Sequence, residues 1–532
     1  ASKSLLVGVA ALGFGLLGDL ALPSSAAAQD ASALLNERCG QCHTREPGGT
    51  LSRISYQRKT PEAWFMTIVR MEMIHGLELT DDERRRLIKH LADTRGLAPE
   101  ETQGYRYILE REPNVLESFD DAEFPTMCGR CHSGARVTLQ RRTQDEWELL
   151  VHFHLGQYPT TEYQALGRDR EWFKIALEQY APKLAAEYPL ETPAWTRWQS
   201  VEPADLSGSW RVAGSTPGRG EFSGTMTAEA AGDDSYDISL KGSYADGTPV
   251  SGAGTANVYT GYEWRGSLDV DGVRMRQVFA ATPDGQQLSG RMFQVDADEL
   301  GSRMTAVRED SVNPVVIAVQ PGYIRAGETA RLTLVGTKLN GQVSLGEGVR
   351  VDRVISASPT GITVEATASD GAAVGTRTVK VGHYEAADAL TVYDEIAAVK
   401  VEPGYGMARV GGSGTTPPVK AAFQAVAYAA GPDGQPGTED DLRIGVMPAT
   451  WSVEPFDEVA ATLEDVKFAG AMDAESGLFT PADAGLNPAR PYSTNNAGNL
   501  KVVATVAEGG RTVSGEGQLI VTVQRWNDPP IR

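Results

Sequence analysis

The four cysteines of this 532-residue chain all lie in one pattern used twice, CGQCH at 39–43 and CGRCH at 128–132. Cysteines at i and i+3 share one face of a helical turn, and the histidine at i+4 lies beside the first cysteine. A macrocycle on that face can bond both sulfurs while its iron meets the imidazole, which is the attachment signature of c-type haem. We therefore expect two covalently bound c-type haems, attached through Cys39, Cys42, Cys128 and Cys131, with His43 and His132 as proximal iron ligands.

Two other uses of CxxC pairs fit less well. Zinc ribbons space their cysteine pairs by roughly 15–20 residues, far less than here, and a zinc site would leave the two following histidines unexplained. A thioredoxin-like redox pair requires a βαβ context, which the surrounding sequence lacks. The histidine after each pair thus favours haem over both alternatives.

Each CxxCH unit is followed by a similar segment. TPEAWFMTIVRMEMIHGLELTDDE follows the first, and TQDEWELLVHFHLGQYPTTEY follows the second. The matched positions are Thr60 with Thr143, Trp64 with Trp147, Val69 with His152 and Met71 with His154. This duplication predicts two cytochrome c-like halves, each with a CxxCH helix, a tryptophan-bearing helix and a closing helix.

The duplication also selects candidates for the sixth iron ligand. Met71 and His154 occupy one equivalent position, and each side chain can bind iron. We expect a His/Met haem at His43 and a His/His haem at His132. The rivals nearby are Met73, His75 and His152. His90 and His383 are expected to have no such role.

Residues 1–28 have the order of a secretory signal peptide, with an early lysine, a short apolar run and a small-residue end. We expect a cleaved signal and a periplasmic protein. A membrane anchor is the alternative, although Asp19 interrupts the run. The net charge of −21 argues against nucleic acid and anionic lipid as partners. An acidic surface could steer a basic partner, or simply solvate the protein.

The expected fold is multidomain, with an all-α dihaem cytochrome c domain followed by three all-β domains. Beyond the helical part, alternating residues between Gly and Asp turns predict an antiparallel barrel or sandwich. The repeated motif VQPGY and VEPGY then opens two predicted immunoglobulin-like sandwiches. The expected boundaries are 1–28, 29–195, 196–310, 311–394 and 395–532. The acidic loop Gly431–Gly445 could bind calcium, or it could be an ordinary hairpin loop.

The order of these parts resembles the α (dihaem) subunit of quinohaemoprotein amine dehydrogenase over essentially the whole chain. CGQCHT, CGRCHSGARV and RMEMIHGLELT carry the resemblance most specifically. It implies a separate small subunit whose cysteine tryptophylquinone oxidises primary amines to aldehyde and ammonia. It also implies a β-propeller subunit, hence a heterotrimer, and a small copper protein or cytochrome c as electron acceptor. No cysteine here is free to form the quinone, so no catalytic residue is expected in this chain.

Two alternatives from other classes remain open. A dihaem c-type peroxidase needs one iron that can open to peroxide, whereas each half here offers a sixth ligand. A haem-bearing binding or sensor protein would use its β domains for recognition. Co-purification of a quinone-bearing partner, or peroxide turnover by the isolated chain, distinguishes these functions.

Overall fold

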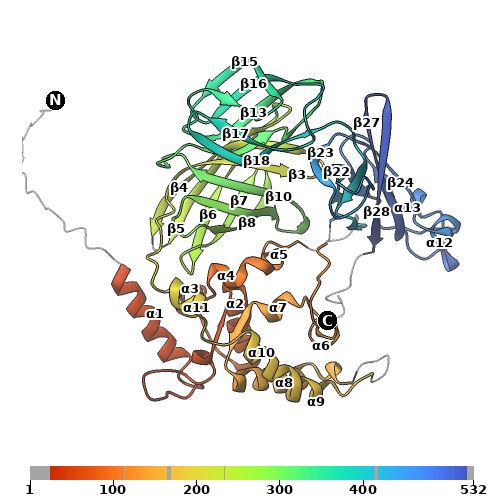
Figure 1. Cartoon of the computed structure of the whole chain (residues 1–532). Helices are drawn as coiled ribbons and strands as arrows, with labels where there is room; N and C mark the ends of the chain where they lie inside the picture. Colours follow the sequence, from red (N-terminus) through yellow and green to blue (C-terminus); the bar gives the residue numbers. More distant parts are fainter. Residues whose placement is uncertain (1–23, 113, 164–168, 233, 412–416, 524–532) are drawn as a thin grey trace, which may run out of the picture.

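A computed structural model describes residues 24–112, 114–163, 169–232, 234–411 and 417–523. The predicted signal peptide lies outside the described residues, except that 24–28 begin the first helix. A helical N-terminal region lies against one end of a β-barrel, and two further β-rich regions lie beyond the barrel (Figure 1). Within these ranges, no helix is both long and apolar enough to cross a membrane.

The helical region consists mostly of short helices. They are α1 (Ser24–Arg38), α2 (Pro61–His75), α3 (Asp81–Thr94), α4 (Pro99–Thr102), α5 (Arg106–Leu109), α6 (Phe124–Cys128), α7 (Ala135–Thr138), α8 (Gln144–Gln157), α9 (Trp172–Ile175), α10 (Ala181–Glu187) and α11 (Pro193–Trp198). Between them lie the 3-10 turns η1 (Ile54–Tyr56), η2 (Gln103–Tyr105) and η3 (Pro159–Thr161), and a π-helical turn η4 (Ala176–Tyr180).

The two tryptophan-bearing helices begin in the same way. The side chain of Thr60 accepts a hydrogen bond from the backbone N–H of Ala63 at the start of α2. Thr143 does the same for Glu146 at the start of α8. Threonine is a favoured N-cap because its oxygen satisfies a backbone N–H that the helix leaves free. The duplication seen in the sequence is therefore a structural repeat at both helix starts.

A two-stranded antiparallel sheet joins the two halves immediately before these caps. Strand β1 (Gln57–Lys59) pairs with β2 (Gln140–Arg142), and the central pair is Arg58 with Arg141. These two arginines occupy equivalent positions in the duplicated segments. An approximate two-fold axis therefore passes between Arg58 and Arg141, and it relates α2 to α8.

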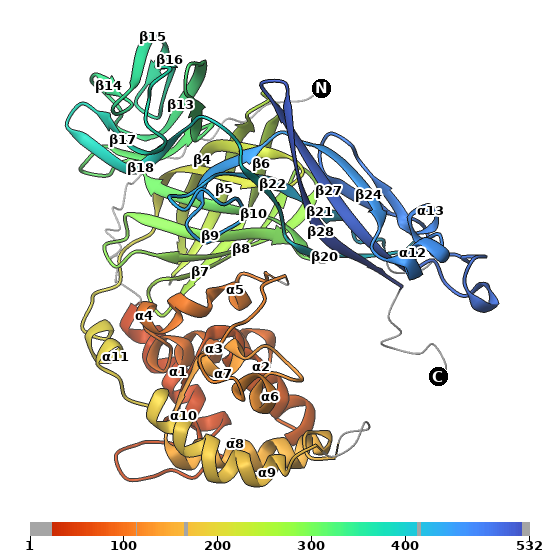
Figure 2. The ribbon, with the colours of Figure 1, turned by 45° about the vertical axis from the view of Figure 1, so that its right-hand side comes forward.

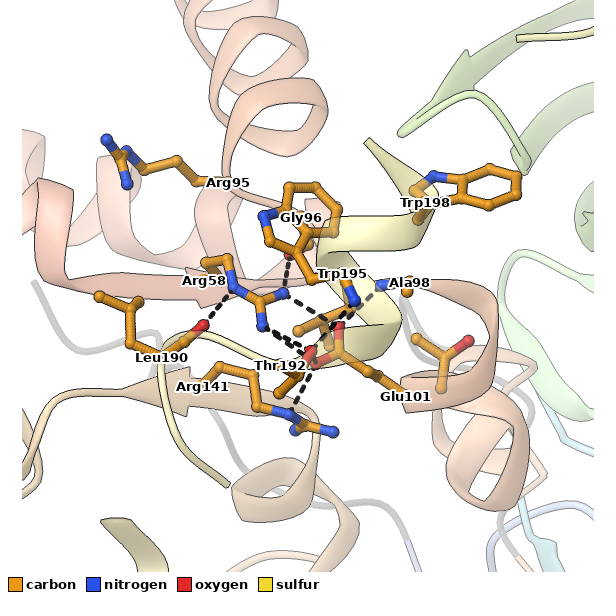
Figure 3. A network of polar contacts seen from close by, with 12 residues as sticks. Arg58, Arg95, Gly96, Ala98, Glu101, Arg141, Leu190, Thr192, Trp195 and Trp198 are labelled. Carbon is orange, nitrogen blue, oxygen red and sulfur yellow. Dashed lines mark hydrogen bonds and ion pairs between the residues drawn. The ribbon is translucent and has the colours of Figure 1, made fainter. Parts of the chain in front are cut away.

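One buried carboxylate holds both arginines at this axis. Glu101 accepts hydrogen bonds from Arg58 at 2.9 and 3.0 Å and from Arg141 at 3.0 Å (Figure 3). The hydroxyl of Thr192 and the backbone N–H of Ala98 also donate to it, at 2.9 and 2.8 Å. Burial acts to raise the pKa of Glu101, but the two guanidinium groups lower it overall. The carboxylate is thus ionised and fully hydrogen-bonded, as a buried charge must be.

The barrel closes in the order β10-β3-β4-β5-β6-β7-β8-β9. Its strands are β3 (Gly208–Thr216), β4 (Gly220–Gly232), β5 (Ser235–Tyr244), β6 (Pro249–Tyr259), β7 (Glu263–Val270), β8 (Val273–Ala281), β9 (Gln287–Gln294) and β10 (Ala297–Arg308). Buried and exposed residues alternate along β4 and β7, as expected when one face of each strand points inward. Large side chains such as Trp210, Trp264 and Phe279 form one core cluster.

A series of linked ion pairs connects the helical region to this barrel. Arg265 donates to Glu62 in the first turn of α2 at 2.6 Å and to Glu263 at 2.7 Å. Arg106 of α5 donates to the same Glu263 at 2.8 and 3.2 Å. Burial acts to raise the pKa of Glu263, but the two guanidinium charges lower it to about 2. The position of α2 is therefore set by the barrel as well as by its own half.

Beyond the barrel, two four-stranded sheets pack as a sandwich, in the orders β11-β13-β16-β15 and β12-β18-β17-β14. These strands are β11 (Val315–Gln320), β12 (Tyr323–Arg325), β13 (Thr329–Thr337), β14 (Val343–Ser344), β15 (Val349–Ser358), β16 (Gly361–Ala368), β17 (Gly375–Val381) and β18 (Tyr384–Tyr393). Both sheets contribute to one apolar core that includes Leu332, Val364 and Val379.

The last region combines three sheets with two helices (Figure 2). Its elements are β19 (Ala398–Glu402), β20 (Tyr405–Arg409), β21 (Ala421–Ala422), β22 (Gln424–Ala429), β23 (Leu442–Met447), β24 (Thr450–Pro455), α12 (Glu458–Thr462), α13 (Asp465–Ala469), β25 (Gly470–Met472), β26 (Leu478–Pro481), η5 (Pro491–Ser493), β27 (Gly498–Glu508) and β28 (Arg511–Thr522). In the predicted acidic loop, carboxylates of Asp433, Asp440 and Asp441 accept hydrogen bonds from backbone N–H groups of the loop itself.

The expectation of an all-α dihaem cytochrome domain followed by three all-β domains is wrong. The N-terminal region contains the β1–β2 sheet and only a few long helices, and the last region contains α12 and α13. The strands β1 and β2 read Gln-Arg-Lys and Gln-Arg-Arg. They lack the apolar alternation that marks a strand, and they pair because the symmetry axis brings their backbones together. The segment PTTEY contains the short 3-10 turn η3.

We predict that Glu101→Gln destabilises the helical region by about 3–5 kcal/mol, because two buried guanidinium groups lose their shared counter-charge. The measurement is the shift of the first thermal transition of the purified chain. Since the pKa of Glu101 is depressed, its stabilising contribution is present above the ordinary glutamate pKa. That contribution is lost in acid, as the pH falls through the folded-state pKa.

The matched control is Glu100→Gln. Glu100 is the neighbouring residue, and its ion pair with Arg197 at 2.8 Å is exposed on both sides. Exposed pairs contribute little, so a shift below about 0.5 kcal/mol is expected. Equal effects of the two substitutions would contradict a central role for Glu101.

Candidate functional site

A cavity of about 460 Å³ adjoins the second CxxCH unit. Cys128, Cys131, His132 and His154 all line it. The first three come from α6 and the turn after it, and His154 comes from the last turn of α8. The structure therefore brings the predicted attachment cysteines, the proximal histidine and the predicted distal histidine of the second half to one cavity.

The two histidine rings line the same cavity at a separation that suits two ligands of one metal ion. Their centroids are 6.4 Å apart, with the ring planes inclined by 50°. Two metal–nitrogen bonds of about 2 Å, each extended by roughly 1 Å to the ring centre, put two ligand rings about 6 Å apart. The spacing of His132 and His154 thus fits one iron between them.

Hydrogen bonds set the orientation of both rings. The Nδ1 of His132 lies 2.9 Å from the carbonyl oxygen of Ser133, and the Nδ1 of His154 lies 2.7 Å from that of Leu150. A carbonyl oxygen only accepts, so each Nδ1 carries the proton and each Nε2 keeps its lone pair. Burial lowers the pKa of both imidazoles, which keeps them neutral. This is the tautomer and charge state that a metal ligand needs.

His152, the other histidine of α8, lies outside this cavity. His152 does not line the cavity, and its ring packs edge-on against Phe173 with centroids 5.1 Å apart. No hydrogen bond orients its ring within the described part of the chain. The geometry therefore favours His154 over His152 as the distal ligand.

The cavity is strongly cationic although the chain is acidic. Among the described residues that line it there is no carboxylate, whereas five are basic: Lys59, Arg70, Arg130, Arg136 and Arg142. Burial lowers the pKa of Lys59 well below its usual range and lowers that of Arg142 to about 10. A ligand that brings negative charge into the cavity would relieve this cost.

Trp147 carries a buried indole N–H at this cavity. It lines the cavity, its side chain is only 1% exposed, and its indole N–H has no hydrogen-bond partner in the part of the chain that the structure describes. Its equivalent in the first half, Trp64, donates to the carbonyl of Arg95 at 3.0 Å. A haem carries two carboxylate groups, so the unpaired N–H and the basic lining fit that group. The residues that line the cavity are therefore compatible with a bound haem.

The first half contributes one wall of this second-half cavity. Ala63, Met66, Thr67 and Arg70 of α2 line it, together with Lys59 of β1. Sequence reasoning missed these residues. The only available signal was the duplication, because a symmetric repeat that packs about its own axis brings each half against the other.

The first CxxCH unit lies at the end of α1. Cys39 packs against the core of the first half, which includes Trp64 and Ile68, and burial raises the pKa of its thiol to about 11. The Nδ1 of His43 lies 2.8 Å from the carbonyl oxygen of Ser52. This leaves its Nε2 free for a metal, as in the second half.

Met71 is half-buried on the face of α2 that also carries Trp64 and Ile68. The cavities described do not place Met71 and His43 on a common wall, so this ligand stays a prediction. Met73 is 81% exposed, and His75 is exposed. Neither rival is better placed.

Four family models together match nearly the whole chain. Residues 29–195 match the haem-binding domain of the quinohemoprotein amine dehydrogenase α subunit. Residues 203–309, 313–394 and 399–531 match domains II, III and IV of the same subunit. No curated protein matches this chain.

Similar solved structures cover only parts of the chain. A redesigned β-barrel is 18% identical over 20% of this chain and 92% of its own, with a TM-score of 0.18. A Bacteroides ovatus protein of a mixed-linkage glucan utilization locus is 12% identical over 60% of this chain and 68% of its own, with a TM-score of 0.19. These low scores carry no argument about function.

We predict that His154→Met raises the lower of two haem reduction potentials, because a thioether ligand favours the reduced iron relative to a second imidazole. Redox titration of the purified protein, followed by its absorption spectrum, measures this shift. His152→Met is the control and should leave potentials and spectra unchanged. A response to the His152 substitution alone would reverse the ligand assignment.

Proposed function

The chain belongs to the family of quinohemoprotein amine dehydrogenase α subunits, and we propose that it is the dihaem electron-transfer subunit of such an enzyme. The resemblance noted from the sequence is confirmed by the four family models. The chain is thus a subunit of an oxidoreductase. In our proposal it accepts electrons from a cysteine tryptophylquinone on a separate small subunit. It passes them to a small copper protein or cytochrome c.

The opposed pair His132 and His154 is the observation that carries the proposal. Two oriented, neutral imidazoles with ring centres 6.4 Å apart would both serve as ligands to the iron of a haem bound here, which would leave no position for peroxide. A closed coordination sphere suits electron transfer, whereas peroxide turnover needs an open one. The peroxidase alternative therefore loses support at this site.

The side chains around the cavity have distinct proposed roles. When bound, a haem supplies a centre that accepts and releases one electron at a time. His132 and His154 would hold its iron, while Cys128 and Cys131 would anchor its edge. Trp147 would donate a hydrogen bond to a carboxylate of the group, and the basic lining would balance the negative charge. The first unit would use Cys39, Cys42, His43 and Met71 in the same way.

Substrate chemistry is assigned to another subunit. All four cysteines lie in CxxCH units, so none is left to build a tryptophylquinone in this chain. The amine is oxidised to aldehyde and ammonia at the quinone, and this chain carries the electrons away. We further propose a heterotrimer with a β-propeller subunit, a periplasmic location and a cleaved signal at residues 1–28. We propose domain boundaries at 29–195, 196–310, 311–394 and 395–532.

We predict two haem adducts on the mature polypeptide. Intact-mass analysis of protein exported to the periplasm should show both, and Cys131→Ala should lose the second-half haem or reduce it to a single thioether. Cys42→Ala should affect only the first-half haem. A polypeptide mass without haem would contradict the proposal.

We predict that the isolated haem-loaded chain does not oxidise primary amines, since it lacks the quinone. The measurement is haem reduction after addition of a primary amine, with dithionite as a control that the haems are reducible. Amine-dependent reduction without any other subunit would contradict the division of labour proposed here.

A further inference from the structure

The two halves of the helical region meet a second time near their approximate two-fold axis. The guanidinium carbon of Arg70 on α2 lies 4.6 Å from the ring centre of Phe153 on α8. These residues occupy equivalent positions in the duplicated segments, as Arg58 and Arg141 do. Both side chains also line the second-half cavity. The axis therefore passes through a stacked pair at the edge of that cavity.

This pair lies between the two predicted distal ligands. Arg70 directly precedes Met71, and Phe153 directly precedes His154. The rings of Phe153 and His154 are also in edge-on contact, with centroids 5.8 Å apart. A continuous path of four residues thus runs Met71–Arg70···Phe153–His154, and only one step in it is a through-space contact.

Helix α2 is the wall that separates the two sites. Met66, Thr67 and Arg70 face the second-half cavity. Trp64 and Ile68 face the core of the first half, where Cys39 packs. An α-helix with its side chains is about 10–12 Å across, so the two sites lie on opposite sides of one helix.

The position of Arg70 depends on this stacking. It forms no ion pair with any carboxylate in the described ranges of the chain, although arginine usually finds one. A guanidinium over an aromatic face is attracted by the ring quadrupole. The stack thus holds a positive charge in the wall between the sites.

We propose that Arg70 and Phe153 form the bridge through which the two haem sites exchange electrons. The inference rests on the proposed function, because it requires a haem in each half. One electron leaves the reduced haem of one half and reduces the oxidised haem of the other, with no bond formed or broken and no proton transferred. The quinone of the partner subunit supplies the electrons during turnover.

The test uses two variants of the dihaem chain. Phe153→Leu replaces the ring by an aliphatic side chain, and Arg70→Met replaces the guanidinium by an uncharged side chain of similar length. A rapid light-driven reduction loads one electron, and absorption changes follow its redistribution between the haems. We expect the redistribution rate to fall several-fold in both variants. Phe153→Tyr keeps the ring and should retain the rate of the unsubstituted chain.

Equilibrium potentials provide a second readout. Removing the cation with Arg70→Met should lower the potential of the second-half haem, because a nearby positive charge favours the reduced state. Phe153→Leu should leave that potential nearly unchanged while still slowing exchange. If Arg70 and Phe153 only stabilised the fold, the substitutions would not change the exchange rate and the reduction potential independently.

Matched controls come from α2 and the neighbouring helix α3. Phe65 on α2 is 47% exposed and does not line the cavity, so Phe65→Leu should leave the rate unchanged. Arg85→Met on α3 removes an exposed charge and should alter neither rate nor potentials. Unchanged exchange in both Phe153→Leu and Arg70→Met, with both haem spectra intact, would overturn the bridge. Loss of the proposed function would show separately, as a chain with fewer than two haems.

Discussion

The arrangement of the haem-binding region depends on one carboxylate shared by two arginines. Glu101 lies where the two halves meet, and Arg58 and Arg141 reach it from symmetry-equivalent strand positions. A single carboxylate between two guanidinium groups leaves a buried positive charge, so the carbonyls of Gly96 and Leu190 that also accept from Arg58 matter. The spacing of α2 and α8, and hence of everything they carry, follows from this junction.

The sequence predicted haem binding, which the family match supports, better than it predicted the architecture. The spacing of each CxxCH unit is a local property, so the attachment residues could be proposed from the sequence alone. The equivalence of Met71 and His154 came from comparing two segments of one chain. His154 then proved to face His132 across the cavity, whereas the structure gives Met71 no comparable partner among the cavities described.

Other features could not be read from the sequence for physical reasons. Glu101 and Glu100 are adjacent carboxylates with the same local pattern, and only the folded chain distinguishes the buried one from the exposed one. The strands β1 and β2 are basic rather than apolar, so no hydrophobic period marks them. The wall that α2 provides to the second cavity depends on a packing between halves that a linear pattern does not encode. The net charge of −21 also concealed a cavity whose described lining holds five lysine and arginine side chains and no carboxylate.

The junction at Glu101 has a consequence for the order of biogenesis. Two of its partners, Leu190 and Thr192, lie near the end of the helical region. A nascent chain therefore exposes both CxxCH units before the residues that complete the junction have emerged. Until then Glu101 lacks the hydroxyl of Thr192 and Arg58 lacks the carbonyl oxygen of Leu190. If the proposed haems are attached to these units, their attachment can begin before the junction at Glu101 has all of its partners.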